Sequence, residues 1–173
     1  MFKQTADIQT ADMLNIPVPE AHYHIVKVEA SDVQKKLVES FAERAEKVHN
    51  RLVDSSQDNM LLITNDGRKA ALDQRLINTA LGDYDGSKVN TCVENIYEIW
   101  EQTMDKKSAQ LVFCDLSTPK GDGSFNVYDD IRQKLIAKGI PADEIEFIHN
   151  ADSDAKKKEL FAKVRRGQIR VLM

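Results

Sequence analysis

The stretch AQLVFCDLSTPKGDGSFNVYDDIRQKLIAKG, residues 109–139, decides the fold. It begins with a mostly apolar run at residues 109–114, which is typical of a strand buried on both faces. A polar loop follows this run. From residue 126 to residue 138 apolar side chains recur at helical spacing, and Gly139 ends the pattern. The stretch therefore predicts a strand, a loop and a helix in succession.

The same rhythm continues to the end of the chain. Residues 145–148 predict a second strand, a helix then begins at Asp152 or Ser153, and residues 169–173 predict a third strand. Strands that alternate with helices over short connections form parallel sheets with right-handed crossovers. We therefore predict an α/β fold, a βαβαβ sheet over residues 87–173. Because the sequence stops inside the third strand, we expect this sheet to be truncated at its C-terminal end.

Residues 1–86 predict a mainly helical segment with one short strand, which leads into the α/β part. Residues 23–28 are rich in β-forming side chains and predict that strand. Ser31 followed by Gln34 has the capping-box pattern, and the apolar period behind it predicts a helix over residues 32–52.

Further along, a short apolar run at residues 59–64 ends at the turn signal Asn-Asp-Gly of residues 65–67. A helix is then predicted over residues 68–81. Ser87 is placed to cap the helix that opens the α/β part.

The composition limits the classes of function. The chain has 173 residues and a net charge of −4, whereas a domain that binds nucleic acid by itself is usually basic. The sequence contains no apolar run of membrane-spanning length, and its first residues lack the layout of a secretory signal. We therefore expect a cytoplasmic protein without a membrane partner. Its two cysteines, Cys92 and Cys114, are expected to be reduced core thiols.

Two polar loops follow predicted strands, at residues 115–123 and 149–152. Because ligands bind at the carboxyl ends of parallel strands, both loops are expected at one edge of the sheet. They offer hydroxyl, cationic and other polar groups that suit phosphate oxygens. The candidate nucleic-acid-binding residues are Ser117, Thr118, Lys120, His149 and Asn150. On spacing alone, ordinary solvated turns are the simpler interpretation of these loops.

Several catalytic patterns are missing from the sequence. It has no glycine-rich loop ending in Lys-Ser or Lys-Thr, no GxSxG elbow and no HExxH pair. Asp115 follows a predicted strand, but the second aspartate of an aspartyl phosphotransferase is replaced by Ser117. Metal ligands are not clustered. We therefore predict no catalytic residue, no metal site and no cofactor for this chain.

Several strings resemble the second RecA-like lobe of superfamily II helicases. QLVFCDLST (residues 110–118) resembles motif IV, and EFIHNADSDAKKKELFAKVRRGQIRVLM (residues 146–173) resembles the stretch that follows it. SKVNTCVENIYEIWE (residues 87–101) is similar to the preceding helix in the Swi/Snf-like branch. TADIQTADMLNIPVP (residues 5–19) and DNMLLITNDGRKAALDQRLIN (residues 58–78) are similar to large helicase–DNA methylase proteins of bacterial mobile elements.

The resemblance implies a fragment of an ATP-dependent DNA helicase or translocase. ATP and Mg would serve the parent protein, and the first lobe and the methylase domain would be partners of this chain, together with DNA. By the resemblance, Ser117 and Thr118 match the end of motif IV, which contacts the nucleic-acid backbone, and His149 and Asn150 match the following loop. Residues 119–125 lengthen the motif IV loop, so the contact could shift to Lys120.

Because the sequence lacks the Walker lysine and the Mg-binding acid, we expect no ATP hydrolysis from this chain alone. Two other classes fit the same pattern. One is a non-enzymatic module that docks protein through its helical N-terminal part, and the other is a flavodoxin-like nucleotide-binding domain.

Overall fold

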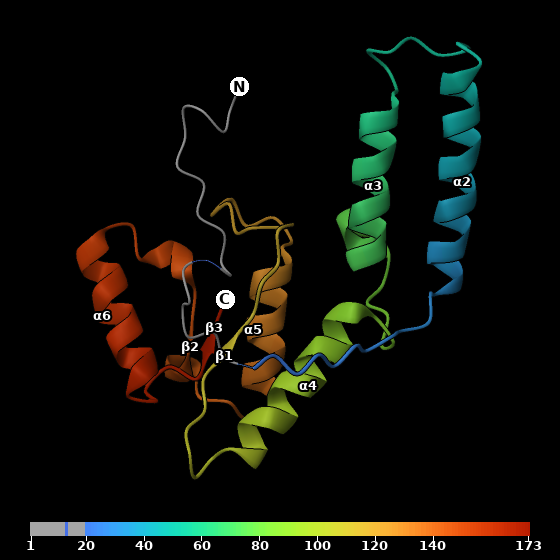
Figure 1. The fold of residues 1–173 in the computed structure, drawn as a ribbon. Coiled ribbons are helices and arrows are strands. Elements are labelled where there is room, and N and C mark those ends of the chain that lie inside the picture. The colour runs from blue at the N-terminus through green and yellow to red at the C-terminus, as the bar shows by residue number, and fades with distance from the viewer. Residues whose placement is uncertain (1–12, 14–19) are drawn as a thin grey trace.

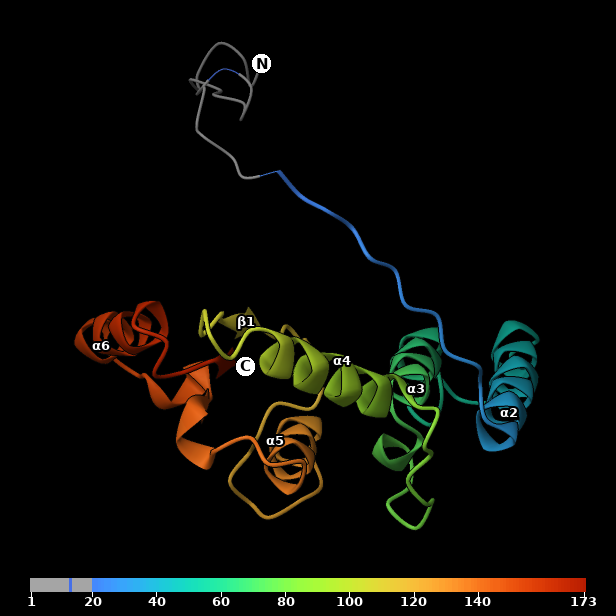
Figure 2. The same cartoon turned by 90° about the horizontal axis from the view of Figure 1, so that it is seen from below.

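The computed structural model describes residue 13 and residues 20–173 (Figures 1 and 2). The helices and strands of this part are α2 (Asp32–His49), α3 (Met60–Leu72), α4 (Lys88–Gln102), β1 (Gln110–Leu111), α5 (Val127–Ala137), β2 (Ile145–Glu146), α6 (Asp154–Arg165) and β3 (Val171–Leu172). Three short 3-10 helices connect them, namely η2 (Gln74–Leu76), η3 (Ala142–Glu144) and η4 (Ile148–Asn150).

The sheet has three parallel strands in the order β1-β3-β2, so the predicted α/β class is confirmed. Gln110 pairs with Val171 on one side of β3, and Ile145 pairs with Val171 on the other. Each strand is only two residues long, yet the backbone pairing extends past these limits. The N–H of Val112 donates to the carbonyl of Leu172 at 2.8 Å, and the N–H of Ile148 donates to that of Met173 at 2.7 Å.

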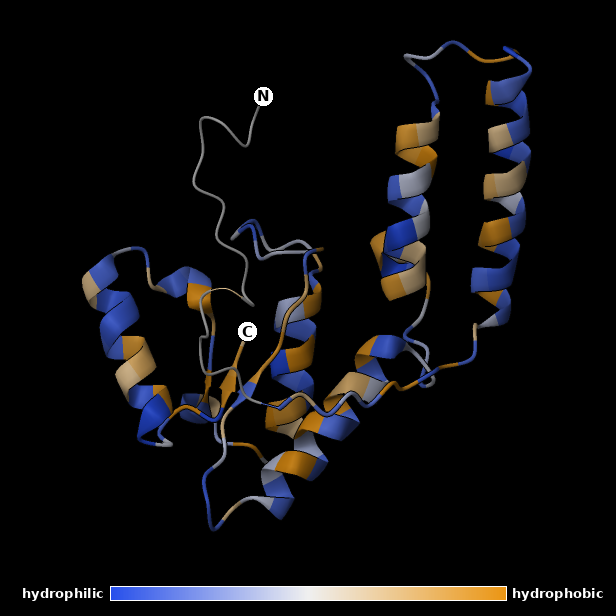
Figure 3. Ribbon diagram, viewed as in Figure 1, coloured by the Kyte–Doolittle hydropathy of each residue, from blue (hydrophilic) through white to orange (hydrophobic). Residues whose placement is uncertain are grey.

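Helices cover the two faces of the sheet unequally. Because side chains alternate along a strand, Val171 faces α4 and α5, whereas Leu172 faces α6. The core between the sheet, α4 and α5 consists of Val89, Val93, Ile96, Val127, Tyr128, Ile131, Leu135, Ile140, Ile145, Phe147, Val171 and Met173. On the α6 side the buried residues are Ala151, Leu160, Ile169 and Leu172. Figure 3 shows a hydrophobic β3 beside a largely hydrophilic α6.

Helices α2 and α3 form a hairpin that projects from the α/β part (Figure 1). Its buried core is Phe41, Ile63 and Ala70. The predicted capping box of α2 is confirmed, because the Ser31 hydroxyl accepts the Gln34 N–H and the Gln34 side chain accepts the Ser31 N–H. This helix ends at His49, three residues before the predicted end.

The predictions for the α/β helices also hold. Ser87 caps α4 and Asn126 caps α5, and Gly139, just after α5, takes a φ of 109° that favours glycine. Cys92 and Cys114 are free and lie half-buried against the core, as expected. In the part of the chain that the structure describes, no helix combines the length and apolar character that crossing a membrane requires.

The strand predicted at residues 23–28 is wrong. This segment has no regular secondary structure, and Tyr23 and Ile25 are 90% and 81% exposed. β-Forming side chains favour a half-buried pleated surface, and they form no strand where no neighbouring strand pairs with them.

The turn predicted at residues 65–67 is also wrong, because α3 runs through it as one helix. Two contacts with α2 hold this turn of helix in place. Ile63 and Ala70 pack on the α2 side, and Asp66 forms an ion pair with Arg44 at 2.9 Å. A glycine inside a helix costs about 1 kcal/mol, which such packing offsets. The helix predicted to reach residue 81 stops at Leu72, where Asp73 takes an extended conformation.

Candidate functional site

The two polar loops meet at Tyr128, in the first turn of α5. Its hydroxyl donates to the carbonyl of Cys114 at 2.5 Å, just before the first loop. Its ring lies edge-on to the His149 ring, with the centroids 5.1 Å apart. Because β1 and β2 both run parallel to β3, the segments that follow them leave the sheet at the same edge. Tyr128 therefore joins the start of one candidate loop to the other.

Ser117 has a structural role in the first loop. It lies half-buried at a φ of 63°, and its hydroxyl accepts the N–H of Val127 at 2.9 Å. This bond satisfies a backbone donor of the first turn of α5, which has no partner inside the helix. Ser117 therefore fixes the shape of the loop, and its hydroxyl is already engaged.

The other four predicted residues lie on the surface. Thr118 and Lys120 are exposed on the first loop, and His149 and Asn150 are exposed on the second. The Asn150 amide donates to a carboxylate oxygen of Glu146 at 2.7 Å, which orients it along β2. Thr118, Lys120 and His149 therefore offer the more accessible polar groups at this edge.

Carboxylates limit how strongly this edge attracts anions. Asp115 at the start of the first loop forms an ion pair with Arg68 at 2.8 Å. Asp122, two residues after Lys120, accepts hydrogen bonds from the hydroxyl and N–H of Ser124, and these bonds lower the pKa of its carboxyl. Asp122 therefore stays ionised at neutral pH, and with Asp115 already engaged by Arg68 we expect only weak attraction of phosphate at this edge.

An apolar hollow of about 580 Å³ opens beside the first loop. The apolar side chains that line it include Leu111, Phe113, Ile148, Phe161, Leu172 and Met173. Phe113 is 90% exposed and Leu111 is 58% exposed, although the sequence predicted a strand buried on both faces. Val112 and Cys114 point into the core instead. All four side chains are apolar or nearly so. The sequence therefore could not show that the face carrying Leu111 and Phe113 is exposed while the face carrying Val112 and Cys114 is buried.

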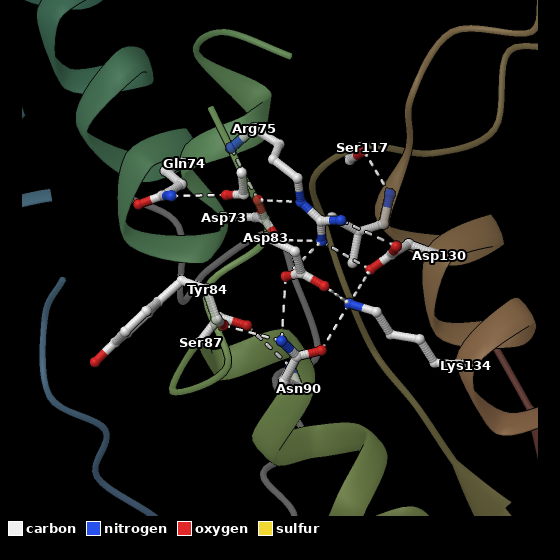
Figure 4. Close-up of polar contacts among 12 residues, drawn as sticks. Asp73, Gln74, Arg75, Asp83, Tyr84, Ser87, Asn90, Ser117, Asp130 and Lys134 are labelled. Carbon is white, nitrogen blue, oxygen red and sulfur yellow. Dashed lines mark hydrogen bonds and ion pairs between the residues drawn. The ribbon is translucent and has the colours of Figure 1, made fainter. Parts of the chain in front are cut away.

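A second polar cluster joins the helical hairpin to α5 (Figure 4). Its centre is Arg75, whose guanidinium donates to both oxygens of Asp73 at 2.9 and 2.7 Å and to both oxygens of Asp130 at 3.1 and 2.8 Å. The Arg75 side chain is only 13% exposed, and that of Asp73 is 2% exposed. The hydrogen bond with Asp73 is the main reason that the pKa of Arg75 is raised above its ordinary value.

Lys134 extends this cluster toward α4. Its ammonium contacts Asp83 at 2.6 Å, Asp130 at 2.8 Å and the side-chain oxygen of Asn90 at 2.6 Å. Burial by itself would raise the pKa of Asp83, but the hydrogen bond from Lys134 and the nearby charges of Arg75 and Lys134 lower it overall. We call the five charged residues Asp73, Arg75, Asp83, Asp130 and Lys134 the polar junction.

The polar junction was not predicted from the sequence. Asp73 and Arg75 are close in sequence, but no local pattern links Arg75 to Asp130 on another helix. Arg75 is paired with Asp73 and Asp130, and Lys134 is paired with Asp83 and Asp130, so each charged group of the cluster is already engaged by an oppositely charged neighbour. Its arrangement fits a structural connection between the hairpin and the α/β part.

Among the described residues, no group of three or more His, Cys, Asp or Glu side chains is placed to hold a metal ion. Comparisons with protein-family models, with curated proteins and with solved structures found no match to this chain.

Proposed function

We propose that this chain is a second-lobe portion of a superfamily II DNA helicase or translocase and contributes contacts to the nucleic-acid backbone. The observation that carries the proposal is the parallel sheet whose two polar loops leave at one edge and meet at Tyr128. This edge is where open parallel sheets bind their ligands. The resemblance of residues 110–118 to motif IV is the reason for choosing DNA as that ligand.

Lys120, Thr118 and His149 are the residues proposed to contact phosphates, and Ser117 and Asn150 act through the shapes of their loops. Such contacts position a strand without reading its sequence. ATP and Mg would act elsewhere in the parent protein, because this sequence lacks the phosphate-binding loop that phosphoryl transfer requires. The first helicase lobe and the methylase domain are the proposed partners within the parent protein.

The test is a fluorescence-anisotropy titration of labelled single- and double-stranded DNA at low salt. The variants are Lys120→Ala and His149→Ala, with Lys106→Ala as the matched control. Lys106 is an exposed lysine that precedes β1, and it therefore lies toward the opposite edge of the sheet. Loss of one phosphate contact should lower the slope of log affinity against log salt by about 0.9 for duplex DNA.

We expect weak binding that Lys120→Ala reduces more than Lys106→Ala does. Equal effects of the two substitutions would show that the attraction is unspecific, and they would contradict the assignment of this edge. A protein-docking module and a flavodoxin-like domain both predict no difference between the two variants.

A further inference from the structure

The helical hairpin and η2, the short helix that follows it, contact the segment of residues 115–125 at both of its ends; this segment is the first polar loop with the two residues after it. At the start, Arg68 of α3 forms an ion pair with Asp115 at 2.8 Å. At the other end, the guanidinium of Arg75 lies over the Phe125 ring, 4.4 Å from its centroid. Both contacts join segments that are far apart in the sequence; Arg68 and Asp115, for example, are separated by 47 residues. The hairpin is thus placed to influence the shape of this loop.

The two contacts differ in strength because they differ in burial. The side chains of Arg68 and Asp115 are 54% and 88% exposed, and ion pairs of this kind contribute little. The Arg75 guanidinium is held in place by Asp73 and Asp130, which are 2% and 14% exposed. A cation fixed in this way offers Phe125 a rigid surface, and a cation–π contact strengthens as it is desolvated.

We propose that Arg75 is a positioning residue through which η2, the short helix after the hairpin, holds the loop of residues 115–125 in one conformation. Asp130 fixes the guanidinium to α5, Phe125 packs on its face, and Ser117 then closes the loop on the N–H of Val127. The consequence for DNA rests on the proposed function, but the positioning role does not.

Lysine cannot replace Arg75 in this role. An ammonium is a compact charge that cannot donate in pairs to two carboxylates while it presents a flat face to an aromatic ring. Arg75→Lys therefore keeps the charge of the polar junction but removes the surface under Phe125. Phe125→Leu does the reverse, because it leaves every ion pair intact and removes only the ring.

The experiment is amide hydrogen exchange of the whole chain, measured by NMR in the absence of DNA. The reporter is the Val127 N–H, which donates to the Ser117 hydroxyl, and the reference is the Met173 N–H, which donates to Glu146 in the sheet at 3.0 Å. The variants are Phe125→Leu and Arg75→Lys. Phe161→Leu, which alters a 40% exposed aromatic on α6, is the control.

We expect exchange at Val127 to become about three- to tenfold faster in Phe125→Leu and Arg75→Lys, with the Met173 rate and the control unchanged. The double variant should exchange no faster than the faster single variant, because both substitutions break the same contact. Unchanged exchange at Val127 would overturn the proposal. Equal acceleration at Met173 would also overturn it, because it would indicate loss of overall stability.

This outcome is independent of the DNA titration. A loosened loop combined with equal effects of Lys120→Ala and Lys106→Ala would leave the positioning role standing and refute the proposed function. If both proposals hold, Phe125→Leu should also weaken DNA binding about two- to fivefold, since the loop would be held less firmly in its binding conformation.

Discussion

The helical hairpin and the α/β part are held together by different forces. Between the sheet, α4 and α5, twelve buried residues form one continuous apolar core. Between α2 and α3, three buried residues form the core among the described residues. Burial of apolar surface is the main stabilising contribution in proteins, so the hairpin has much less of it.

Polar contacts compensate in part for the small apolar core of the hairpin. Within the hairpin, Arg44 of α2 forms ion pairs with Asp58, just before α3, at 2.7 Å and with Asp66 of α3 at 2.9 Å. The Ser31 hydroxyl donates to the side chain of Gln74 at 2.8 Å, and the polar junction then ties η2 to α5. Such contacts depend on geometry, charge state and solvent, whereas apolar burial depends chiefly on area. The two regions should therefore respond differently to substitution and to pH.

The largest effect is expected in the apolar core. Leu135 is fully buried on α5, and Leu135→Ala should lower the free energy of unfolding by about 3 kcal/mol, because it removes apolar contacts and leaves a cavity. Urea unfolding followed by circular dichroism measures this. Leu61→Ala is the control, since Leu61 is 79% exposed on α3 and should change stability by less than about 0.5 kcal/mol. Similar losses in both variants would remove the contrast between the regions.

The polar junction should give the next largest effect. Arg75→Met leaves the buried carboxylate of Asp73 without its paired cation and leaves Asp130 with Lys134 alone. Breaking a fully buried pair costs about 3–5 kcal/mol, and because Arg75 is partly exposed we expect about 2 kcal/mol. The measurement is the same urea titration. Arg165→Met, at the exposed end of α6, is the control, and a loss as large as that of Arg75→Met would argue against the junction as the cause.

Ser31 allows a test within the hairpin. Ser31→Ala removes both the cap of α2 and the hydrogen bond to Gln74, and it should cost about 1.5 kcal/mol. Ser153→Ala removes only the cap of α6 and should cost about 0.7 kcal/mol. Thermal unfolding of the two variants side by side compares them. Equal losses would mean that the Ser31–Gln74 bond adds no stability.

The smallest expected effect is a pH dependence at Asp83. Its folded pKa is lowered below the usual 3.8, so its ionised form stabilises the folded state above that value. This contribution is lost as the pH falls through the folded pKa. In urea titrations between about pH 5 and pH 3, Asp83→Asn should lose less stability than the unmodified chain does. Parallel pH profiles would show that Asp83 contributes nothing to the acid response.

The structure could be predicted from the sequence where the sequence pattern was clear. The parallel sheet, the capping box at Ser31 and the cap at Ser87 follow from apolar spacing and short-range hydrogen bonds. Prediction failed where tertiary packing outweighed a local signal. Gly67 lies inside α3 because α2 packs beside it, and residues 23–28 form no strand because no strand of the described part pairs with them.

The candidate site was predictable only in part. Parallel topology places both loops at one edge, and this much follows from the order of the strands. The bond from Val127 to the Ser117 hydroxyl depends on how the loop of residues 115–125 folds back on α5. The contacts of Arg75 with Phe125 and Asp130 depend on how η2, this loop and α5 come together. No spacing rule within a single sequence contains that information.

The position of β1 has a practical consequence. It is an outer strand, and the segment that begins with it turns Leu111 and Phe113 toward solvent. Among the described residues no strand pairs with the outer side of β1, and an edge strand with exposed apolar side chains can pair with a strand of another chain. Purified solutions of this protein should therefore become turbid as concentration and temperature rise, and a charged replacement such as Phe113→Lys should keep them clear.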